Sequence, residues 1–282
     1  MAGHDAAVDV LTKAGHAMPV IKGLGWTFDA VADTYEKFRP GYPAALYHAL
    51  FDYAASASGK QAVEVGIGGG QATLPVLEAG WNVTAVEPGA NFCARCREKF
   101  AAYPGFTAIQ GKFEDVRLPE NSADLIYAAS SFHWVPEEIG YSKAYATLRQ
   151  GGVFARFANH PFRSKDNPAL AEDVQRAYAA YYYPFHQRKP EVPAEYTEKE
   201  AAARAEIAAK YGFTDIRYAM FTRERSFSAE EYVTLLGTYS DHIVIEEQTR
   251  RKFFEAITDA INRHGGTMVI CDTLDLQLAR KA

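Results

Sequence analysis

Short apolar runs alternate with amphipathic stretches along the first 160 residues of the chain. Runs bounded by glycine, proline or polar residues predict strands at Ala62–Ile67, Asn82–Glu87, Phe106–Gln110, Asp124–Ala128 and Gly152–Ala158. Between them, apolar residues with helical spacing predict helices at Gln71–Ala79, Ala90–Ala102 and Val135–Leu148. This alternation is typical of a mostly parallel sheet with crossover helices, which is an α/β fold of the Rossmann-like, doubly wound kind.

The flanking regions extend this scheme. Helices at Phe28–Phe38 and Pro43–Ser56 precede the first strand. After residue 160 the pattern predicts helices at Asn167–Tyr183, Thr197–Tyr211, Ser228–Tyr239 and Glu246–Arg263, and strands at Thr214–Phe227 and Thr267–Leu278. We therefore expect one domain, residues 26–282, with a seven-stranded sheet, a helical N-terminal cap and a helical insertion at about 160–212 after strand five. Residues 1–25, with a possible helix at Ala6–Ala14, form an N-terminal leader.

The composition and charge of the chain exclude several classes of function. The chain has 282 residues, 48% of them hydrophobic, so it can bury a sizeable core. The net charge of −5 argues against a broad nucleic-acid surface. There is no run of 18 apolar residues and no secretory signal pattern, so we expect a cytoplasmic protein without membrane contact. We expect it to be a monomer or a homodimer.

The three cysteines cannot form a disulfide framework. Cys93 and Cys96 have the spacing of a redox pair, because a neighbouring arginine lowers a thiol pKa. We favour two small residues on one helix face. A metal site would need a second pair of ligands, so no metal is expected.

The stretch VEVGIGGGQATL, residues 63–74, holds four glycines between Gly66 and Gly70. A phosphate-binding P-loop would end in Gly-Lys-Ser/Thr, and no lysine is present. The dinucleotide spacing G-x-G-x-x-G fails in both registers, because the positions that require glycine are Gln71 and Thr73. The spacing that fits is E-x-G-x-G-x-G, with Glu64, Gly66, Gly68 and Gly70.

A second acid, Glu87, ends the next predicted strand. An acid about 20 residues beyond such a loop accepts hydrogen bonds from the vicinal hydroxyls of a ribose. The glycines let the backbone approach an uncharged nucleoside–thioether junction, while Glu64 orients loop amides or a ligand ammonium, directly or through water. These features favour S-adenosylmethionine as the cofactor.

The sequence resembles the class I S-adenosylmethionine-dependent methyltransferases over about residues 26–280. Beyond the loop, the segments that carry the resemblance are residues 111–115, 118–119, 122–126, 129–134 and 148–152. The resemblance implies that Glu114 or Asp115 meets the adenine amino group beside the Phe113 backbone, and that Gln71 and Ser130 also border the cofactor. Residues 28–35, 39–43, 131–134, 236–240 and 264–266 are similar to the small-molecule branch that includes trans-aconitate methyltransferase.

Several residues are candidates for the acceptor side. His133 is a candidate proton acceptor or a residue that caps the following helix, and Trp134 is a candidate wall of the pocket. Tyr178 and Tyr181–Tyr183 predict a lid in which one or two rings, Tyr181 and Tyr182 above all, cover the acceptor. Asn159 and His160, at the end of strand five, are expected to face the same cleft.

The N-terminal segment supplies further candidates. The resemblance implies that Tyr35, Arg39 and Tyr42 close over the methionine end of the donor. Arg39 is expected to pair there with a carboxylate, with an acidic acceptor, or with Glu36 or Asp33 of its own segment.

The leading hypothesis is an enzyme that methylates a small molecule. Transfer from a sulfonium is an in-line displacement that depends mainly on alignment, so a base is needed only when the acceptor must lose a proton. Alternatives are a lyase or cyclase that cleaves S-adenosylmethionine and releases methylthioadenosine, and a nucleoside-binding module without turnover. A nicotinamide dehydrogenase is disfavoured by the loop spacing.

Overall fold

The computed structural model describes residues 41–55, 59–191 and 194–282. Its strands are β1 Gln61–Val65, β2 Asn82–Glu87, β3 Phe106–Gln110, β4 Ala123–Ala129, β5 Leu148–Arg163, β6 Phe213–Ser228 and β7 Thr267–Lys281. They form a seven-stranded sheet in the order β3-β2-β1-β4-β5-β7-β6. The pairs among β1–β5 are parallel, whereas β7 is antiparallel to both β5 and β6. The predicted Rossmann-like fold is confirmed.

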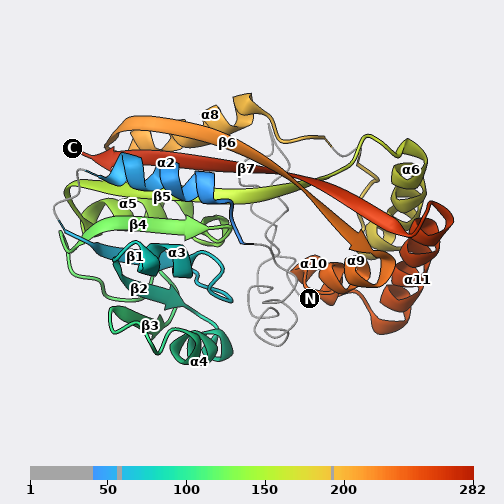
Figure 1. The fold of residues 1–282 in the computed structure, drawn as a ribbon, viewed down its shortest axis with the longest axis horizontal. Coiled ribbons are helices and arrows are strands. Elements are labelled where there is room, and N and C mark those ends of the chain that lie inside the picture. The colour runs from blue at the N-terminus through green and yellow to red at the C-terminus, as the bar shows by residue number, and fades with distance from the viewer. Residues whose placement is uncertain (1–40, 56–58, 192–193) are drawn as a thin grey trace, which may run out of the picture.

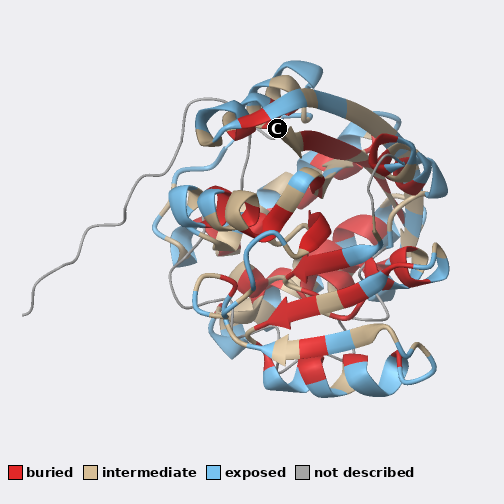
Figure 2. Ribbon diagram, turned by 90° about the vertical axis from the view of Figure 1, so that its left-hand side faces the viewer, coloured by how far each residue is buried: buried red, intermediate tan, exposed pale blue. Residues whose placement is uncertain are grey.

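Helices cover both faces of the sheet (Figure 1). One layer consists of α2 Ala44–Ala54, α3 Thr73–Glu78 and α4 Ala90–Lys99, whose apolar side chains share a core with one face of the strands. On the other face, α5 Glu137–Thr147 and the 3₁₀ turn Glu206–Tyr211 contribute to a second core. The helix α8 Glu198–Ala205 contacts β6 and β7. Figure 2 shows the buried residues gathered on the strands and on the inner sides of the helices.

Strand β5 is longer than predicted. The last pair between β4 and β5 joins Ala129 to Phe157, yet β5 continues to Arg163 because β7 stays paired with it. The sequence pattern favoured an end at Ala158, since Asn159, His160 and Pro161 are atypical of a strand interior. Antiparallel pairing with β7 overrides that local preference.

The extended ends of β5, β6 and β7 carry a group of helices beyond the edge of the sheet (Figure 1). This helical subdomain consists of α6 Pro168–Ala177, a π-helix Tyr178–Tyr182, α7 Tyr183–Phe185, α9 Ala229–Leu236, α10 Ser240–Ile243 and α11 Glu247–Arg263. It has its own core, in which Phe253, Ile257 and Leu235 are almost fully buried. The subdomain therefore has a hydrophobic centre separate from that of the sheet.

Local sequence signals explain where several helices begin. Thr197 and Glu200 form a capping box at the start of α8, and Ser228 and Glu231 form another at α9. Asn167 accepts a hydrogen bond from the Leu170 amide at the start of α6. These capping bonds satisfy amides that a helix leaves unpaired at its first turn.

Two predicted segments are outside the described residues: the leader at 1–25 and the helix at Phe28–Phe38. Among the residues that are described, no helix has both the length and the apolar character needed to cross a membrane.

Candidate functional site

The glycine turn follows β1 at the carboxyl edge of the sheet. Gly66, Gly68 and Gly70 have φ values of +73°, +51° and +74°, which residues with a side chain rarely adopt. A Cβ on Gly66 would lie 2.7 Å from the Ser131 Cβ, and one on Gly70 would lie 2.7 Å from the Phe100 ring. Glycine at these positions is thus required by the backbone shape and by close packing.

Glu87, the last residue of β2, holds this turn. Its Oε2 accepts a hydrogen bond from the Gly68 amide at 3.0 Å, and its Oε1 accepts one from the Gly89 amide at 2.8 Å. The sequence predicted a carboxylate that binds ribose hydroxyls, and the structure places the carboxylate directly against the loop.

Glu64 lies in β1 beneath the turn and is only 1% exposed. Its Oε2 accepts hydrogen bonds from the Thr73 hydroxyl at 2.7 Å and the Tyr127 hydroxyl at 2.8 Å. The sequence predicted that Glu64 orients loop amides or a ligand ammonium, directly or through water, and that role stays a prediction. Burial raises the pKa of Glu64 to about 8, although the two hydroxyls act in the opposite direction.

Two buried polar atoms at this turn have no hydrogen-bond partner among the described residues: Glu64 Oε1 and Gln71 Nε2. Buried polar groups are nearly always hydrogen-bonded, because an unpaired one costs about 1–3 kcal/mol. An orphaned acceptor and an orphaned donor beside a bare backbone fit a polar ligand that carries both donors and acceptors. The amino-acid end of S-adenosylmethionine has that character.

Phe113 and Glu114 follow β3 on the same edge. The Phe113 ring is buried in the core, and the ammonium of Lys143 lies 5.2 Å from its centroid. The Glu114 carbonyl accepts a hydrogen bond from Lys143 Nζ at 3.2 Å. The place of the Phe113 backbone beside an adenine stays a prediction. The role of Glu114 or Asp115 at an adenine stays a prediction.

Ser130 joins three segments at the carboxyl end of β4. Its φ of +54° is left-handed, an uncommon conformation for a residue with a side chain. Its Oγ lies 2.9 Å from the Tyr42 hydroxyl and accepts the Asn159 amide at 3.3 Å, while its own amide donates to the Phe157 carbonyl. Strained residues of this kind cluster at binding sites. Tyr42, Ser130 and Asn159, predicted separately, are thus brought together.

The next turn carries His133 and Trp134, in the 3₁₀ segment Phe132–Trp134. His133 is exposed, and its ring centroid lies 5.1 Å from that of Trp134. Ser131 donates a short hydrogen bond to the Val65 carbonyl, which fixes this turn against the end of β1. The proposed roles of His133 and Trp134 stay predictions.

A charged cluster that the sequence analysis missed lies on β6 and β7. Asp272 is fully buried and receives hydrogen bonds from Arg223 Nε at 3.0 Å, from Arg225 Nε at 2.5 Å and from Asn159 Nδ2 at 3.0 Å. Arg223 also donates to the Gly41 carbonyl at 2.7 Å. The cluster connects the segment before α2 to β5. Alternating charges in strand β6 are its only signal in the sequence.

A second buried acid, Asp275, holds His160. The Nε2 of His160 lies 2.9 Å from Asp275 Oδ1, and Asp275 Oδ2 accepts the Tyr196 hydroxyl at 2.9 Å. The His160 and Tyr196 rings stack with a centroid separation of 3.6 Å. The sequence placed His160 at the end of a strand but offered no signal for its partners.

The tyrosines of the predicted lid lie in the helical subdomain. Tyr182 is buried, and its hydroxyl donates to Asp241 Oδ2 at 2.6 Å. Tyr178 OH lies 3.0 Å from His242 Nε2, and Tyr181 packs against the same core. Burial raises the pKa of Tyr182 well above its usual range, and the nearby Asp241 adds to the effect. These contacts place the rings in the core of the helical subdomain. A role of Tyr181 and Tyr182 over an acceptor stays a prediction.

Cys93 and Cys96 support the turn from α4. Both are buried free thiols; Cys93 Sγ donates to the Glu87 carbonyl at 3.4 Å, and Cys96 Sγ donates to the Gly68 carbonyl at 3.3 Å. These contacts agree with the structural interpretation of the pair. Tyr35 and Arg39, predicted at the cofactor, lie outside the described residues.

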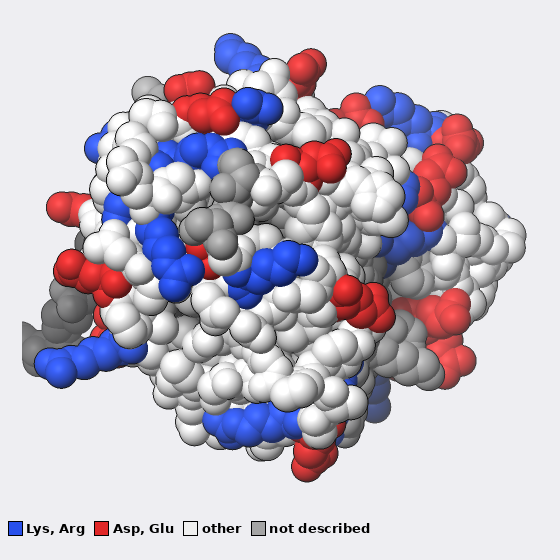
Figure 3. All heavy atoms as spheres, turned by 60° about the vertical axis from the view of Figure 1, so that its left-hand side comes forward, with Lys and Arg blue, Asp and Glu red and all other residues white. Residues whose placement is uncertain are grey.

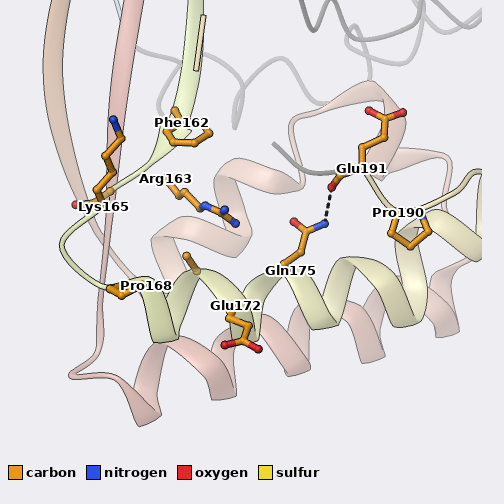
Figure 4. Close-up of a pocket in the computed structure, with 10 residues that line it drawn as sticks. Phe162, Arg163, Lys165, Pro168, Glu172, Gln175, Pro190 and Glu191 are labelled. Carbon is orange, nitrogen blue, oxygen red and sulfur yellow. Dashed lines mark hydrogen bonds between the residues drawn. The ribbon is translucent and has the colours of Figure 1, made fainter. Parts of the chain in front are cut away.

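Two further surfaces lie apart from the glycine turn. A hollow of about 600 Å³ lies between the end of β5, α6 and residues 190–191, where Phe162, Arg163 and Gln175 line it (Figure 4). Gln175 Nε2 donates there to the Glu191 carbonyl at 3.0 Å. On the face drawn in Figure 3, basic and acidic side chains are interspersed rather than gathered into a continuous basic surface. Among the described residues, no group of three or more His, Cys, Asp or Glu is placed to hold a metal ion.

Comparisons with known proteins agree with this geometry. The family profile described as "Methyltransferase domain" matches residues 63–155, which run from β1 into β5. An uncharacterized methyltransferase of a Geobacillus species is 30% identical over 158 residues, which cover 53% of this chain and 72% of the relative. One from Mycobacterium tuberculosis is 29% identical over 131 residues, 46% of this chain, so the match spans about half (51%) of that relative's length.

Solved structures share the fold. A candidate type II methyltransferase from Anaeromyxobacter dehalogenans superposes with a TM-score of 0.59 at 21% identity, covering 86% of this chain and 98% of the other. Phosphoethanolamine N-methyltransferase 2 of Haemonchus contortus, in complex with phosphomonomethylethanolamine and S-adenosylhomocysteine, has a TM-score of 0.51 at 15% identity. That similarity covers 90% of this chain and 57% of the other.

Proposed function

The chain belongs to the S-adenosylmethionine-dependent methyltransferases, and from this premise we propose that it transfers the methyl group of S-adenosylmethionine to a small-molecule acceptor. The bound donor supplies an activated methyl group on a positively charged sulfur. The protein's contribution is to align the acceptor with that methyl group and to exclude water. Such alignment supplies about 7–11 kcal/mol of a reaction barrier.

One observation carries the proposal: the glycine turn lies at the point where the strand order reverses, and Glu87 anchors it there. Strand β1 lies between β2 and β4, so the chain crosses to opposite sides of β1 on its way to each of them. Ligands of open α/β sheets bind outside the carboxyl ends of the strands at this point. Glu87 accepts hydrogen bonds from Gly68 in the first loop and from Gly89 in the second loop of that crevice.

We assign residues of this chain to each part of the donor. Glu87 would bind the ribose, Gly66–Gly70 would approach the thioether, and Glu64 with Gln71 would meet the amino-acid end. Phe113 and Glu114 would border the adenine. Ser130, also predicted at the cofactor, lies one residue before Ser131, which packs against Gly66.

The proposal of a small acceptor rests on the surroundings of Ser130. Tyr42 from the segment before α2, Asn159 from β5 and Arg223 from β6 approach the same corner from three directions. Ligand sites for small molecules are concave and have a few convergent polar groups. Two likenesses favour the same class. The sequence is similar to the small-molecule branch that includes trans-aconitate methyltransferase, and the Haemonchus contortus enzyme is in complex with the small molecule phosphomonomethylethanolamine.

Calorimetry with S-adenosylmethionine, S-adenosylhomocysteine and NAD tests the donor site. We expect the first two to bind and NAD not to bind. Glu87→Ala should weaken binding of S-adenosylhomocysteine about 10- to 100-fold, because charge-assisted hydrogen bonds contribute about 1.5–3 kcal/mol. Glu120→Ala, at an exposed acid, is the matched control and should leave binding unchanged. Binding of NAD alone would refute the proposal.

Product analysis tests the reaction. Incubation with S-adenosylmethionine and a panel of small hydroxyl, thiol, amine and carboxylic acid compounds should release S-adenosylhomocysteine. Release of methylthioadenosine would indicate internal cleavage of the donor instead. Tight nucleoside binding without consumption of donor would indicate a binding module.

A further inference from the structure

His160 is one half of a buried histidine–aspartate pair. Its Nε2 lies 2.9 Å from Asp275 Oδ1, and the Asp275 side chain is fully buried, whereas the His160 side chain is 16% exposed. Asp275 lies on β7 and His160 on β5, separated by 115 positions in the sequence. The pair is therefore formed by the pairing of the two strands and not by local structure.

The other contacts of Asp275 determine which nitrogen of His160 carries a proton. The carboxylate also accepts hydrogen bonds from the Ala158 amide, the Tyr196 hydroxyl and the Gln277 amide. Burial opposes the charged form of Asp275, yet the hydrogen bond from His160, the charge of Arg204 and the Tyr196 hydroxyl lower its pKa below the usual range. An ionised carboxylate only accepts, so Nε2 of His160 donates and a neutral ring keeps its lone pair on Nδ1.

The ring is also fixed in direction. It stacks on Tyr196 with an interplanar angle of 1°, and Tyr196 in turn lies under the guanidinium of Arg204 from α8. Among the described residues, Nδ1 of His160 has no hydrogen-bond partner. A histidine oriented by a buried acid through one nitrogen, with the other nitrogen available, has the arrangement of a general base.

His160 lies at the edge where the donor site is. Strand β4 ends at Ala129, paired with Phe157, so His160 is on the part of β5 that extends beyond this edge. The preceding residue, Asn159, donates its amide to Ser130, and the residue after Ser130 packs against Gly66 of the glycine turn. His133, the base predicted from the sequence, is exposed on the turn after β4.

We propose that His160 is the proton acceptor of the reaction and that Asp275 is the residue that positions it, for an acceptor that must lose a proton when it is methylated. This inference rests on the proposed function. The acceptor atom forms a bond to the methyl carbon while the carbon–sulfur bond breaks and its electron pair stays on sulfur, giving neutral S-adenosylhomocysteine. The proton of the acceptor passes to Nδ1 of His160. The acceptor class is thus a hydroxyl, a thiol or an acidic carbon.

Kinetics over a range of pH test the proposal with the full chain and the acceptor panel described above. His160→Gln should lower kcat for a hydroxyl or thiol acceptor about 100-fold or more with a smaller change in KM, and should remove the acidic limb of the kcat/KM profile. Asp275→Asn should cause a comparable loss, because an amide reverses the preferred tautomer. His264→Gln breaks a second histidine–aspartate pair, with Asp173 in the helical subdomain, and should change neither value.

Nitrogen-15 NMR of the unmutated chain with S-adenosylhomocysteine bound tests the same point without a substrate. The neutral ring of His160 should carry its proton on Nε2 and not on Nδ1, and this result supports the proposal even if no acceptor in the panel is methylated. Protonation on Nδ1, or an acidic limb that survives in His160→Gln and vanishes in His133→Gln, would overturn the proposal. Unaltered binding of S-adenosylhomocysteine by His160→Gln shows that the variant folds, and failure of the unmutated chain to bind it would instead refute the proposed function.

Discussion

Glu64 is a buried acid that has no cationic partner among the described residues, and its replacement by glutamine has a consequence that depends on pH. The carboxyl is 1% exposed, two hydroxyls contact its Oε2, and Glu87 is the nearby charge that acts on it. Tyr127 and Thr73 stay neutral at ordinary pH, so neither offsets the cost of a buried negative charge. Glu64→Gln removes the titration and keeps the shape of the side chain.

The size of this change in stability with pH follows from the pKa of Glu64, which burial raises from 4.5 to about 8. Because the folded state holds the proton more tightly than the unfolded state, the native protein has its full stability from this group below pH 4.5. The contribution is lost as the pH rises towards 8. The loss amounts to about 1.4 kcal/mol per pH unit within that window, and to about 5 kcal/mol over all of it.

The assay is urea denaturation of the free protein at several pH values between 5 and 8, for the unmutated chain and for Glu64→Gln. The free energy of unfolding of the unmutated chain, relative to that of the variant, should fall by about 3 kcal/mol from pH 5 to pH 7. Glu120→Gln, at an exposed acid, should give a curve nearly parallel to that of the unmutated chain. If Glu64→Gln also gives a parallel curve, the reasoning about the buried carboxyl is refuted.

Three further predictions test the packing around the site and the subdomain. Gly70→Ala should destabilise the fold by about 1–3 kcal/mol and weaken binding of S-adenosylhomocysteine, because its Cβ would lie 2.7 Å from the Phe100 ring at a φ of +74°. Thermal unfolding measures the first effect and calorimetry the second, and unchanged values would contradict the account of the turn. Asp272→Asn should lower the free energy of unfolding by about 3–5 kcal/mol, since it removes a fully buried carboxylate and leaves two partly buried arginines without their counter-charge. A loss below 1 kcal/mol in urea denaturation would argue against a structural role for the cluster. Tyr182→Phe should cost about 1–3 kcal/mol through the lost hydrogen bond to Asp241 and leave binding of S-adenosylhomocysteine unchanged; weaker nucleoside binding without loss of stability would instead place this ring at the ligand.

Much of the sheet could be predicted because its signals are local. The bounds predicted for β2 and β3 coincide with the observed Asn82–Glu87 and Phe106–Gln110, since buried parallel strands appear as short apolar runs between turn residues. The glycine turn was identifiable for the same reason: positive φ values at Gly66, Gly68 and Gly70 require glycine whatever surrounds them.

The contacts of the tyrosines in the predicted lid could not be predicted from the local sequence. Four tyrosines close together in the sequence indicate that the helix has an aromatic face, but not what that face contacts. The structure pairs Tyr182 with Asp241 and Tyr178 with His242, both about 60 positions away, and it gives this segment a core of its own. A pattern of side chains specifies an amphipathic face, whereas the partner of that face depends on the whole chain path.

The sequence by itself determined the order of strands and helices, the bare turn after β1 and the two acids, Glu64 and Glu87, that lie beside it, because each depends on neighbouring residues and on strand periodicity. Only the tertiary structure decided how far β5 extends and that Asp275 faces His160. That pairing depends on the register between β5 and β7, in which Ala158 lies opposite Asp275 and His160 opposite Thr273. A shift of one residue in this register would turn the acid to the other face of the sheet, so the pair exists only because the complete fold fixes the alignment of distant strands.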